Sequence, residues 1–326
     1  MTQATEQYPL DTSEQRLTVK DPHPRHDTQG DMDVDERLRR AMANLAKNIN
    51  RTTATYMEAC VHCGQCAEAC HYYVQTEDPK YTPIWKLEIF KQAYKRENSP
   101  FGFFYRLFGL KRKVTIEQLG EWQELLYDSC TMCGRCSLIC PMGIDIATLV
   151  GQARHGMFKA GLIPDELHAV AQRAREEGSP LGATAEVFEE RADWMADEHD
   201  TEVYVDEDEA DILVSMSSIE IMKYPNAIGA TAKILNALGE KWTFRTEGYE
   251  ATNFGMMAGN VEWQKHATLK LIDAAVKCGA KLVVLPECGH AYGALRWQGA
   301  ATVSYTHLRA HETAMNIAYA VFCLKR

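Results

Sequence analysis

The chain has 326 residues, a formal net charge of −10 at pH 7 and 46% hydrophobic residues, which is enough for ordinary globular cores. The acidic balance argues against a nucleic-acid binder, which would show a basic face. The start of the chain, MTQATEQYPLDTSEQRL, has no apolar signal core, and no run of about 18 apolar residues is present to span a membrane. We therefore expect a protein of the reducing cytoplasm, where clustered cysteines indicate metal binding rather than disulfides.

The first half of the chain is predicted to be helical. Residues 1–34 are polar without apolar periodicity and are predicted to form a disordered arm. From residue 35, apolar side chains recur at spacings of three and four, which predicts a helix; they are Leu38, Met42, Leu45 and Ile49. Residues 80–128 are predicted to be mostly helical with a break near 98–102, and a further helix is predicted over 146–161. Together these elements indicate a helical domain over residues 35–160.

The second half alternates between strand and helix patterns. Residues 161–210 are predicted to be a helical and acidic linker, because nine acidic residues and no Lys or Arg fall within 197–211. Strands are then predicted at 211–216, 242–245 and 281–285, with helices at 218–238 and 261–278. This β-α-β-α-β order implies a parallel sheet. The predicted fold class is a multidomain α+β protein, in which a helical ferredoxin-like domain precedes a partial parallel α/β domain at 211–300.

Eight cysteines carry the chemistry. Two runs share the spacing C-x2-C-x2-C-x3-C, namely Cys60, Cys63, Cys66 and Cys70, then Cys130, Cys133, Cys136 and Cys140. Three thiolates on a tight turn can cap three irons of one [4Fe–4S] cube, while the fourth cysteine points away and reaches the other cube. The expected ligands are Cys60, Cys63, Cys66 and Cys140 for the first cluster, and Cys130, Cys133, Cys136 and Cys70 for the second.

Zinc is the alternative occupant of these motifs. Structural zinc sites close with four ligands built from C-x2-C pairs, so a third and fourth cysteine in each run are redundant for zinc but needed for a cube. Gly64 and Gly134 occupy matching positions, where they let the loops turn tightly. Arg135 could raise the potential of the second cluster. His62 and His71 flank the first, either as tuning groups or as ordinary packed or exposed residues.

The segment from Phe101 to Lys113, FGFFYRLFGLKRK, is dense in aromatic residues and ends in basic ones. It is too short to span a bilayer. It could lie at a membrane interface or press on a membrane partner; core packing with a solvated basic tail explains the same pattern. Both interpretations stay open from the sequence.

The two cysteine motifs, the helical spacer between them and the phrase from Pro286 to Tyr292, PECGHAY, resemble the DsrK family over residues 35–300. These are heterodisulfide-reductase-like (HdrD/CCG-type) iron–sulfur subunits of membrane DsrMKJOP complexes. The resemblance implies electron transfer in respiratory sulfur metabolism between a quinone-linked cytochrome b subunit and a DsrC-type disulfide or trisulfide carrier. It also implies a cytoplasmic protein attached peripherally to the inner face of the cell membrane.

The chain departs from the family in its α/β half. The family's CCG domain holds a further, unusual [4Fe–4S] site on a cysteine pair and a later C-x-x-C. Here the corresponding positions read Ser217-Ser218 and Asn253-Phe-Gly255, and only Cys278 and Cys288 remain. The first CCG repeat is thus degenerate, and we expect the second and its catalytic cluster only in a longer protein. Cys288 is the one catalytic candidate; the alternative is a lone thiol after a strand.

The last residues no longer resemble the family. Residues 301–326, which include VSYTHLRAHET, are predicted to be a non-native tail translated from an adapter sequence, which would leave Cys323 without a role. The alternative function is that of an iron–sulfur subunit in another CCG-type oxidoreductase, such as a glycolate or lactate oxidase or an anaerobic glycerol-3-phosphate dehydrogenase. A succinate or fumarate enzyme is disfavoured, because no C-x4-C-x2-C run for a [2Fe–2S] cluster exists.

Overall fold

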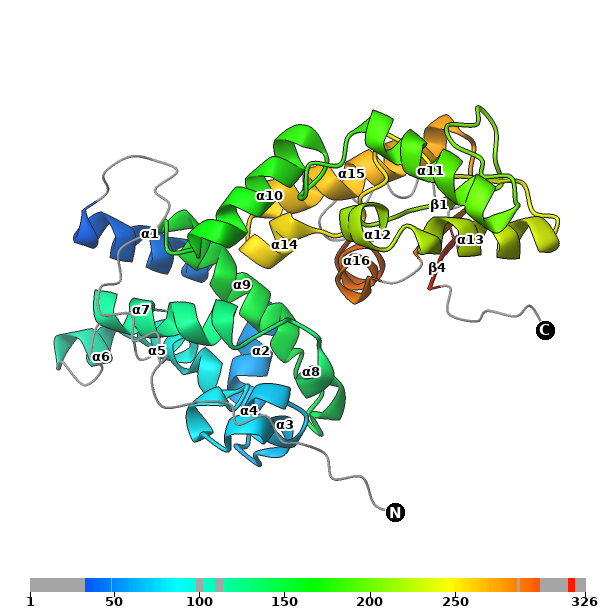
Figure 1. Ribbon diagram of the computed structural model, residues 1–326. Helices are drawn as coiled ribbons and strands as arrows, with labels where there is room; N and C mark the ends of the chain where they lie inside the picture. The colour runs from blue at the N-terminus through cyan, green and yellow to red at the C-terminus, as the bar shows by residue number, and fades with distance from the viewer. Residues whose placement is uncertain are drawn as a thin grey trace, which may run out of the picture.

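The computed structural model describes residues 33–47, 49–97, 102–108, 114–285, 288–299 and 316–319. This part of the chain is mostly helical, with one small sheet in its second half (Figure 1). The helices of the first half are α1 (Val34–Lys47), α2 (Arg51–Ala59), α3 (Gln65–Glu68), α4 (His71–Thr76), α5 (Glu88–Glu97), α6 (Gly102–Leu107), α7 (Ile116–Gln123), α8 (Arg135–Ile139) and α9 (Ile146–Lys159). Short 3₁₀ turns, η1 (Pro79–Tyr81) and η2 (Trp85–Leu87), precede α5, and a π-helical turn, η3 (Glu124–Asp128), follows α7.

Polar side chains mark where several of these helices begin. Asn50 accepts a hydrogen bond from the backbone N–H of Thr53 at 2.9 Å at the start of α2. Asp145 accepts one from the N–H of Thr148 at 3.1 Å at the start of α9. Each cap satisfies a donor that the helix leaves free. The starts of α2 and α9 therefore follow directly from local sequence.

Helix α9 is the central element of the first half, and α1 packs along it. Gly156 makes this approach possible, since a Cβ there would lie 2.8 Å from Leu45 Cγ and 3.2 Å from the Ala41 carbonyl oxygen. The surrounding core is fully buried and includes Phe90, Leu119, Trp122, Leu126 and Met157. Packing at this density fixes the position of α9, which leads away from the second cysteine run (Figure 1).

The second half contains α10 (Asp165–Glu177), α11 (Ala185–His199), α12 (Ser218–Lys223), α13 (Asn226–Ala237), α14 (Phe254–Ala258), α15 (Val261–Lys277), α16 (Gly289–Tyr292) and a π-helical turn, η4 (Gly293–Gln298). Its strands are β1 (Ile212–Val214), β2 (Trp242–Thr243), β3 (Leu282–Leu285) and β4 (Asn316–Tyr319), all parallel, in the order β2-β1-β3-β4. Ile212 pairs with Trp242 on one side and with Leu282 on the other. The predicted parallel sheet is confirmed.

One helix prediction needed adjustment. The helix expected over 218–238 is divided into α12 and α13 at Tyr224 and Pro225, because proline disfavours helical geometry in the residue before it. The segment from Gly255 to Gly259, whose glycines are more typical of a helix than of a nucleotide-binding loop, forms the short α14 and its C-terminal cap. Gly255 packs directly on α15, since a Cβ there would lie 2.3 Å from the backbone nitrogen of Gln264.

The pleat of the strands sends alternate side chains to opposite faces of the sheet. Ile212, Val214 and Val284 join a core with α11, α12 and α13. Leu213 and Val283 join a separate core with α15 and α16. The sheet is therefore covered by helices on both faces, as expected for parallel strands.

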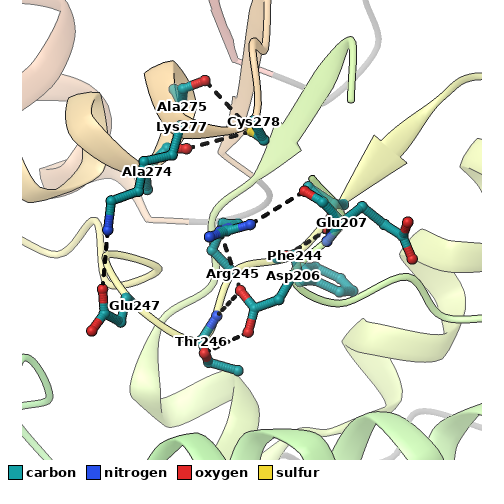
Figure 2. Close-up of polar contacts among 11 residues, drawn as sticks. Asp206, Glu207, Phe244, Arg245, Thr246, Glu247, Ala274, Ala275, Lys277 and Cys278 are labelled. Carbon is teal, nitrogen blue, oxygen red and sulfur yellow. Dashed lines mark hydrogen bonds and ion pairs between the residues drawn. The ribbon is translucent and has the colours of Figure 1, made fainter. Parts of the chain in front are cut away.

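The acidic run at 197–211 is attached to the sheet at several points. Val205 forms an isolated bridge with Phe244, and Asp206 Oδ1 lies 3.2 Å from Arg245 Nε. Thr246 donates its hydroxyl to Asp206 Oδ2 at 2.6 Å and its N–H to Oδ1 at 3.1 Å (Figure 2). The run is therefore less free than its charge alone indicates.

Both predicted terminal segments lie largely outside the described residues. Of the predicted arm at 1–34, the structure describes only the last two residues, and Val34 begins α1. Of the predicted tail at 301–326, it describes only Asn316–Tyr319, which form β4 beside β3. The disorder of the arm and the origin of the tail stay predictions.

Candidate iron–sulfur centres

The two cysteine motifs adopt the same backbone conformation. His62 and Met132, each between the first two cysteines of its run, both have φ of 54°. Gly64 and Gly134 follow with φ of 81° and 75°, a left-handed conformation that glycine adopts without steric cost. Helices α3 and α8 begin at the next residue in each case and pack against each other. The loops are therefore two copies of one structural unit.

Each motif contributes its first three cysteines to one hollow and its fourth cysteine to the other. One hollow is lined by Cys60, Cys63, Cys66 and Cys140, and the other by Cys70, Cys130, Cys133 and Cys136. The structure thus brings together the two sets that the sequence predicted, with the fourth cysteine exchanged between motifs. Ile146, at the start of α9, lines both hollows, so one helix touches both sites.

The donor set fits a [4Fe–4S] cube in each hollow, because four thiols converge there and a cube takes four thiolates. Among the described residues, no group of three or more His, Cys, Asp or Glu side chains could hold a single metal ion. Burial raises the pKa of the Cys66 thiol, and burial together with the nearby Cys130 and Cys133 raises the pKa of Cys136 to about 12. Burial thus disfavours the thiolate form of both side chains, and iron is the kind of cation that takes the place of a thiol proton.

The loop of the second motif is held by three side chains that were not predicted. Three consecutive carbonyl oxygens accept hydrogen bonds from them. Ser129 O accepts from Lys86 Nζ, Cys130 O accepts from Arg154 at 2.6 Å, and Thr131 O accepts from His290 Nε2 at 2.5 Å. The donors come from η2, α9 and α16, which are far apart in the sequence. The second motif is therefore fixed both by the helical half and by the α/β half.

Arg154 also joins the two halves of the chain. Its side chain is 3% exposed; it donates to the Leu126 carbonyl at 2.9 and 2.6 Å and to the Met257 carbonyl, in α14, at 2.6 Å. The guanidinium lies over the Tyr127 ring, 4.8 Å from its centroid. Tyr127 in turn donates to the Ala258 carbonyl at 3.0 Å. Buried hydrogen bonds to a charged donor are strong, so α9 and α14 form one contact region.

Gly259, which ends α14, lies against this region. A Cβ at Gly259 would lie 2.5 Å from both the carbonyl carbon and the carbonyl oxygen of Arg154. His155 Nδ1 lies 2.9 Å from the Gly259 carbonyl oxygen. The glycines at 255 and 259, which in the sequence are too loosely spaced for a nucleotide-binding loop, thus serve close packing between helices.

Cys278 and Cys288 lie at opposite ends of β3. Cys278 is buried at the end of α15, and its thiol donates to the carbonyls of Ala274 at 3.4 Å and Ala275 at 3.5 Å (Figure 2). Cys288 follows the strand and caps α16 by accepting from the N–H of Ala291 at 3.4 Å. Because a strand separates them, these two cysteines do not line one site.

Cys288 lies in a small hollow at the carboxyl ends of β1 and β3. Ser217, Glu220 and Thr252 line the same hollow, so serine occupies the position where the resemblance places the cysteine pair. Burial alone would raise the pKa of the Cys288 thiol, but hydrogen bonds from His290 and Thr252 lower it overall. In the described residues this hollow contains one thiol, which is fewer than a cube requires.

The sequence does contain an indication of the two buried cations, Lys86 and Arg154. Lys86 stands in TPIWKLEIF among apolar residues, and Arg154 falls on the same face of α9 as Val150 and Met157, which are buried. A charged residue inside an apolar stripe is rarely buried without a partner. What the sequence did not provide was the partner, a set of loop carbonyls more than twenty residues away from either side chain.

Comparison with known proteins places iron–sulfur chemistry in the same part of the chain. Residues 56–144 match the 4Fe–4S dicluster domain family. An Hdr-like menaquinol oxidoreductase iron–sulfur subunit 2 from Archaeoglobus fulgidus is 31% identical over 255 residues, covering 74% of this chain and 45% of the relative. A second such protein, from Archaeoglobus profundus, is 30% identical over 253 residues, with the same two coverages.

A more distant similarity extends to heterodisulfide reductases. One subunit of the dihydromethanophenazine:CoB–CoM heterodisulfide reductase of Methanosarcina barkeri is 26% identical over 207 residues, covering 62% of this chain and 46% of the relative. No solved structure matches the chain significantly. The chain spans less than half the length of these curated relatives. The dicluster match supports the prediction of 4Fe–4S binding, and the relatives support the prediction of a heterodisulfide-reductase-like iron–sulfur subunit, while the narrower DsrK assignment stays a prediction.

Proposed function

We propose that the chain carries two [4Fe–4S] clusters and acts as the electron-transfer subunit of a membrane-associated complex in respiratory sulfur metabolism. The observation that carries the proposal is the pair of four-thiol hollows with an exchanged fourth cysteine. When bound, each cube supplies a site that accepts and releases one electron at a time. The similarity to Hdr-like menaquinol oxidoreductase subunits supports a redox role in a larger assembly.

The surroundings of the two hollows suggest where each partner docks. The first hollow includes the exposed Cys63, and its loop carries the exposed Val61; Cys133 of the second hollow is exposed as well. The second hollow faces the α/β half, because Thr131 and Arg154 contact His290 and Met257 there. Under the proposal, a quinone-linked cytochrome b subunit exchanges electrons on one side and a DsrC-type disulfide or trisulfide carrier on the other.

Helix α6 is the proposed attachment surface for the membrane side. Four large apolar side chains of α6 and of the residue that follows it are 51–65% exposed, which favours docking over core packing; they are Phe103, Phe104, Leu107 and Phe108. Phe104 and Phe108 stack with their ring planes 3° apart, so the patch is continuous. The basic residues 111–113 that follow in the sequence lie outside the described residues. Within the described part of the chain, no helix has both the length and the apolar character needed to cross a bilayer.

The attachment surface can be tested with a double variant. Phe104→Ser with Phe108→Ser should release the protein from membranes that contain its complex, because an apolar patch loses most of its buried area. Leu238→Ser, at a side chain that is 66% exposed in the α/β half, is the control and should leave retention unchanged. Equal retention of both variants in sedimented membranes would exclude α6 as the attachment surface.

The cluster content tests the central claim. We expect about eight irons and eight acid-labile sulfides per chain after anaerobic reconstitution, with interacting S = 1/2 EPR signals on reduction. About four irons would mean that one hollow does not hold a cube. About twelve would mean that Cys288 takes part in a third site. Zinc in place of iron would remove the redox function altogether.

A further inference from the structure

The two hollows are alike in thiols and differ in the buried charge beside them. The second motif has Lys86, Arg154 and His290 on three consecutive carbonyls. The corresponding carbonyls of the first motif, from Ala59 to Val61, receive no such side-chain donor from the described residues. The nearest matching cation there is Lys91, whose Nζ lies 3.4 Å from His62 Nε2 and so contacts a side chain of the loop rather than its backbone.

Lys86 is the cation placed most directly at the second hollow. It lines that hollow together with Cys70, Cys130 and Cys136, and it is 2% exposed. Its ammonium also lies over the Tyr72 ring, 5.1 Å from the centroid. Its own backbone carbonyl accepts from Trp122 Nε1 at 2.5 Å, and Trp122 is fully buried. The side chain is therefore locked in position by the core of the helical half.

Burying an ammonium is costly unless negative charge compensates for it. Lys86 lines the second hollow beside Cys70, Cys130 and Cys136, which carry negative charge as thiolates when they bind a cluster. The compensating charge is thus that of the second cysteine set. A buried positive charge stabilises the state of higher negative charge beside it, and a reduced cluster carries one more negative charge than an oxidised one.

We propose that Lys86 is a positioning residue for electron transfer, which holds the second cysteine loop through Ser129 and makes the cluster of that loop the more readily reduced of the two. Electrons that enter at the first hollow then collect at the second, next to the α/β half. The inference rests on the proposed function, because it needs both hollows to hold clusters. It predicts that the second cluster has the higher reduction potential, although the two motifs have the same cysteine spacing.

The test is a redox titration of the reconstituted full chain, followed by EPR, with iron and sulfide measured for every sample. Lys86→Met should lower the reduction potential of the second cluster and shift the electron distribution between the clusters at least tenfold, which is about 59 mV for a one-electron couple. Lys86→Arg, which keeps the charge, should restore most of the wild-type potential. Lys91→Met is the matched control and should leave the second cluster unchanged.

Several results would overturn the proposal. One is a Lys86→Met protein with a full iron content and both potentials unchanged; another is a Lys91→Met protein whose second potential falls as far. If Lys86→Met does not assemble, the two reduction potentials of the wild-type protein are compared instead. Cys133→Ser identifies which of them belongs to the second cluster. If that potential is the lower one, the proposal is wrong. A wild-type protein that holds fewer than two clusters would instead refute the proposed function.

Discussion

The approach of α9 and α14 can be tested at one glycine. Gly259 has φ of 85°, and a Cβ there would lie 2.5 Å from the Arg154 carbonyl group. Gly259→Ala therefore combines two costs, about 1–2 kcal/mol for a left-handed L-residue and about 1–3 kcal/mol for overpacking. Gly239 is the matched control, because it has φ of 68° but no heavy atom within 4 Å of an added Cβ. Gly239→Ala should cost only the first of these amounts.

Hydrogen exchange followed by mass spectrometry on the anaerobic, cluster-loaded protein measures the difference locally. A destabilisation of about 2 kcal/mol or more raises exchange roughly 30-fold or more where opening limits it. For Gly259→Ala we expect this increase in peptides from both α9 and α14, whereas for Gly239→Ala we expect a smaller increase confined to the end of α13. Equal increases in the two variants, or unchanged exchange in α9, would show that the two helices are not in the close contact described.

Two further variants test the ligand exchange and the core. Cys70→Ser should alter the EPR signal of the same cluster as Cys133→Ser, because both residues line the second hollow; a change matching that of Cys63→Ser would refute the exchange. Trp122→Ala should lower the free energy of unfolding by about 3–5 kcal/mol, measured by urea denaturation, since this side chain is fully buried. Trp85→Ala, at a side chain that is 55% exposed, should change it by less than about 1 kcal/mol, and similar losses in both would contradict the burial.

The sequence was most informative where one short pattern determines the structure. The C-x2-C-x2-C-x3-C runs predicted both four-thiol sets, because ligand spacing on a tight turn leaves few arrangements. The parallel sheet followed from the alternation of strand and helix patterns, and β3 was expected within one residue of its observed start at Leu282. These features depend on neighbours in sequence, which is why they could be predicted.

Features that depend on distant partners could not be predicted in this way. Nothing near Lys86 in the sequence identifies the Ser129 carbonyl as its partner, and nothing near Thr131 indicates His290, which lies 159 residues away. The charge of the run at 197–211 predicted a solvated linker, but Asp206 is held by Arg245 and Thr246, which follow β2. The resemblance could not decide the role of Cys288, whereas the fold separates it from Cys278 by the length of β3.

Helix α9 has a consequence for the speed of electron movement. It begins at Ile146, which lines both cysteine hollows, and eight residues later Arg154 reaches α14. Its 14 residues span about 21 Å at 1.5 Å per residue. Electron tunnelling slows steeply with each added ångström, so the separations between redox sites must be held constant while the protein moves. Under the proposed function, a single helix that touches both hollows at Ile146, packs against α1 and binds α14 through Arg154 keeps the distance between the two clusters constant.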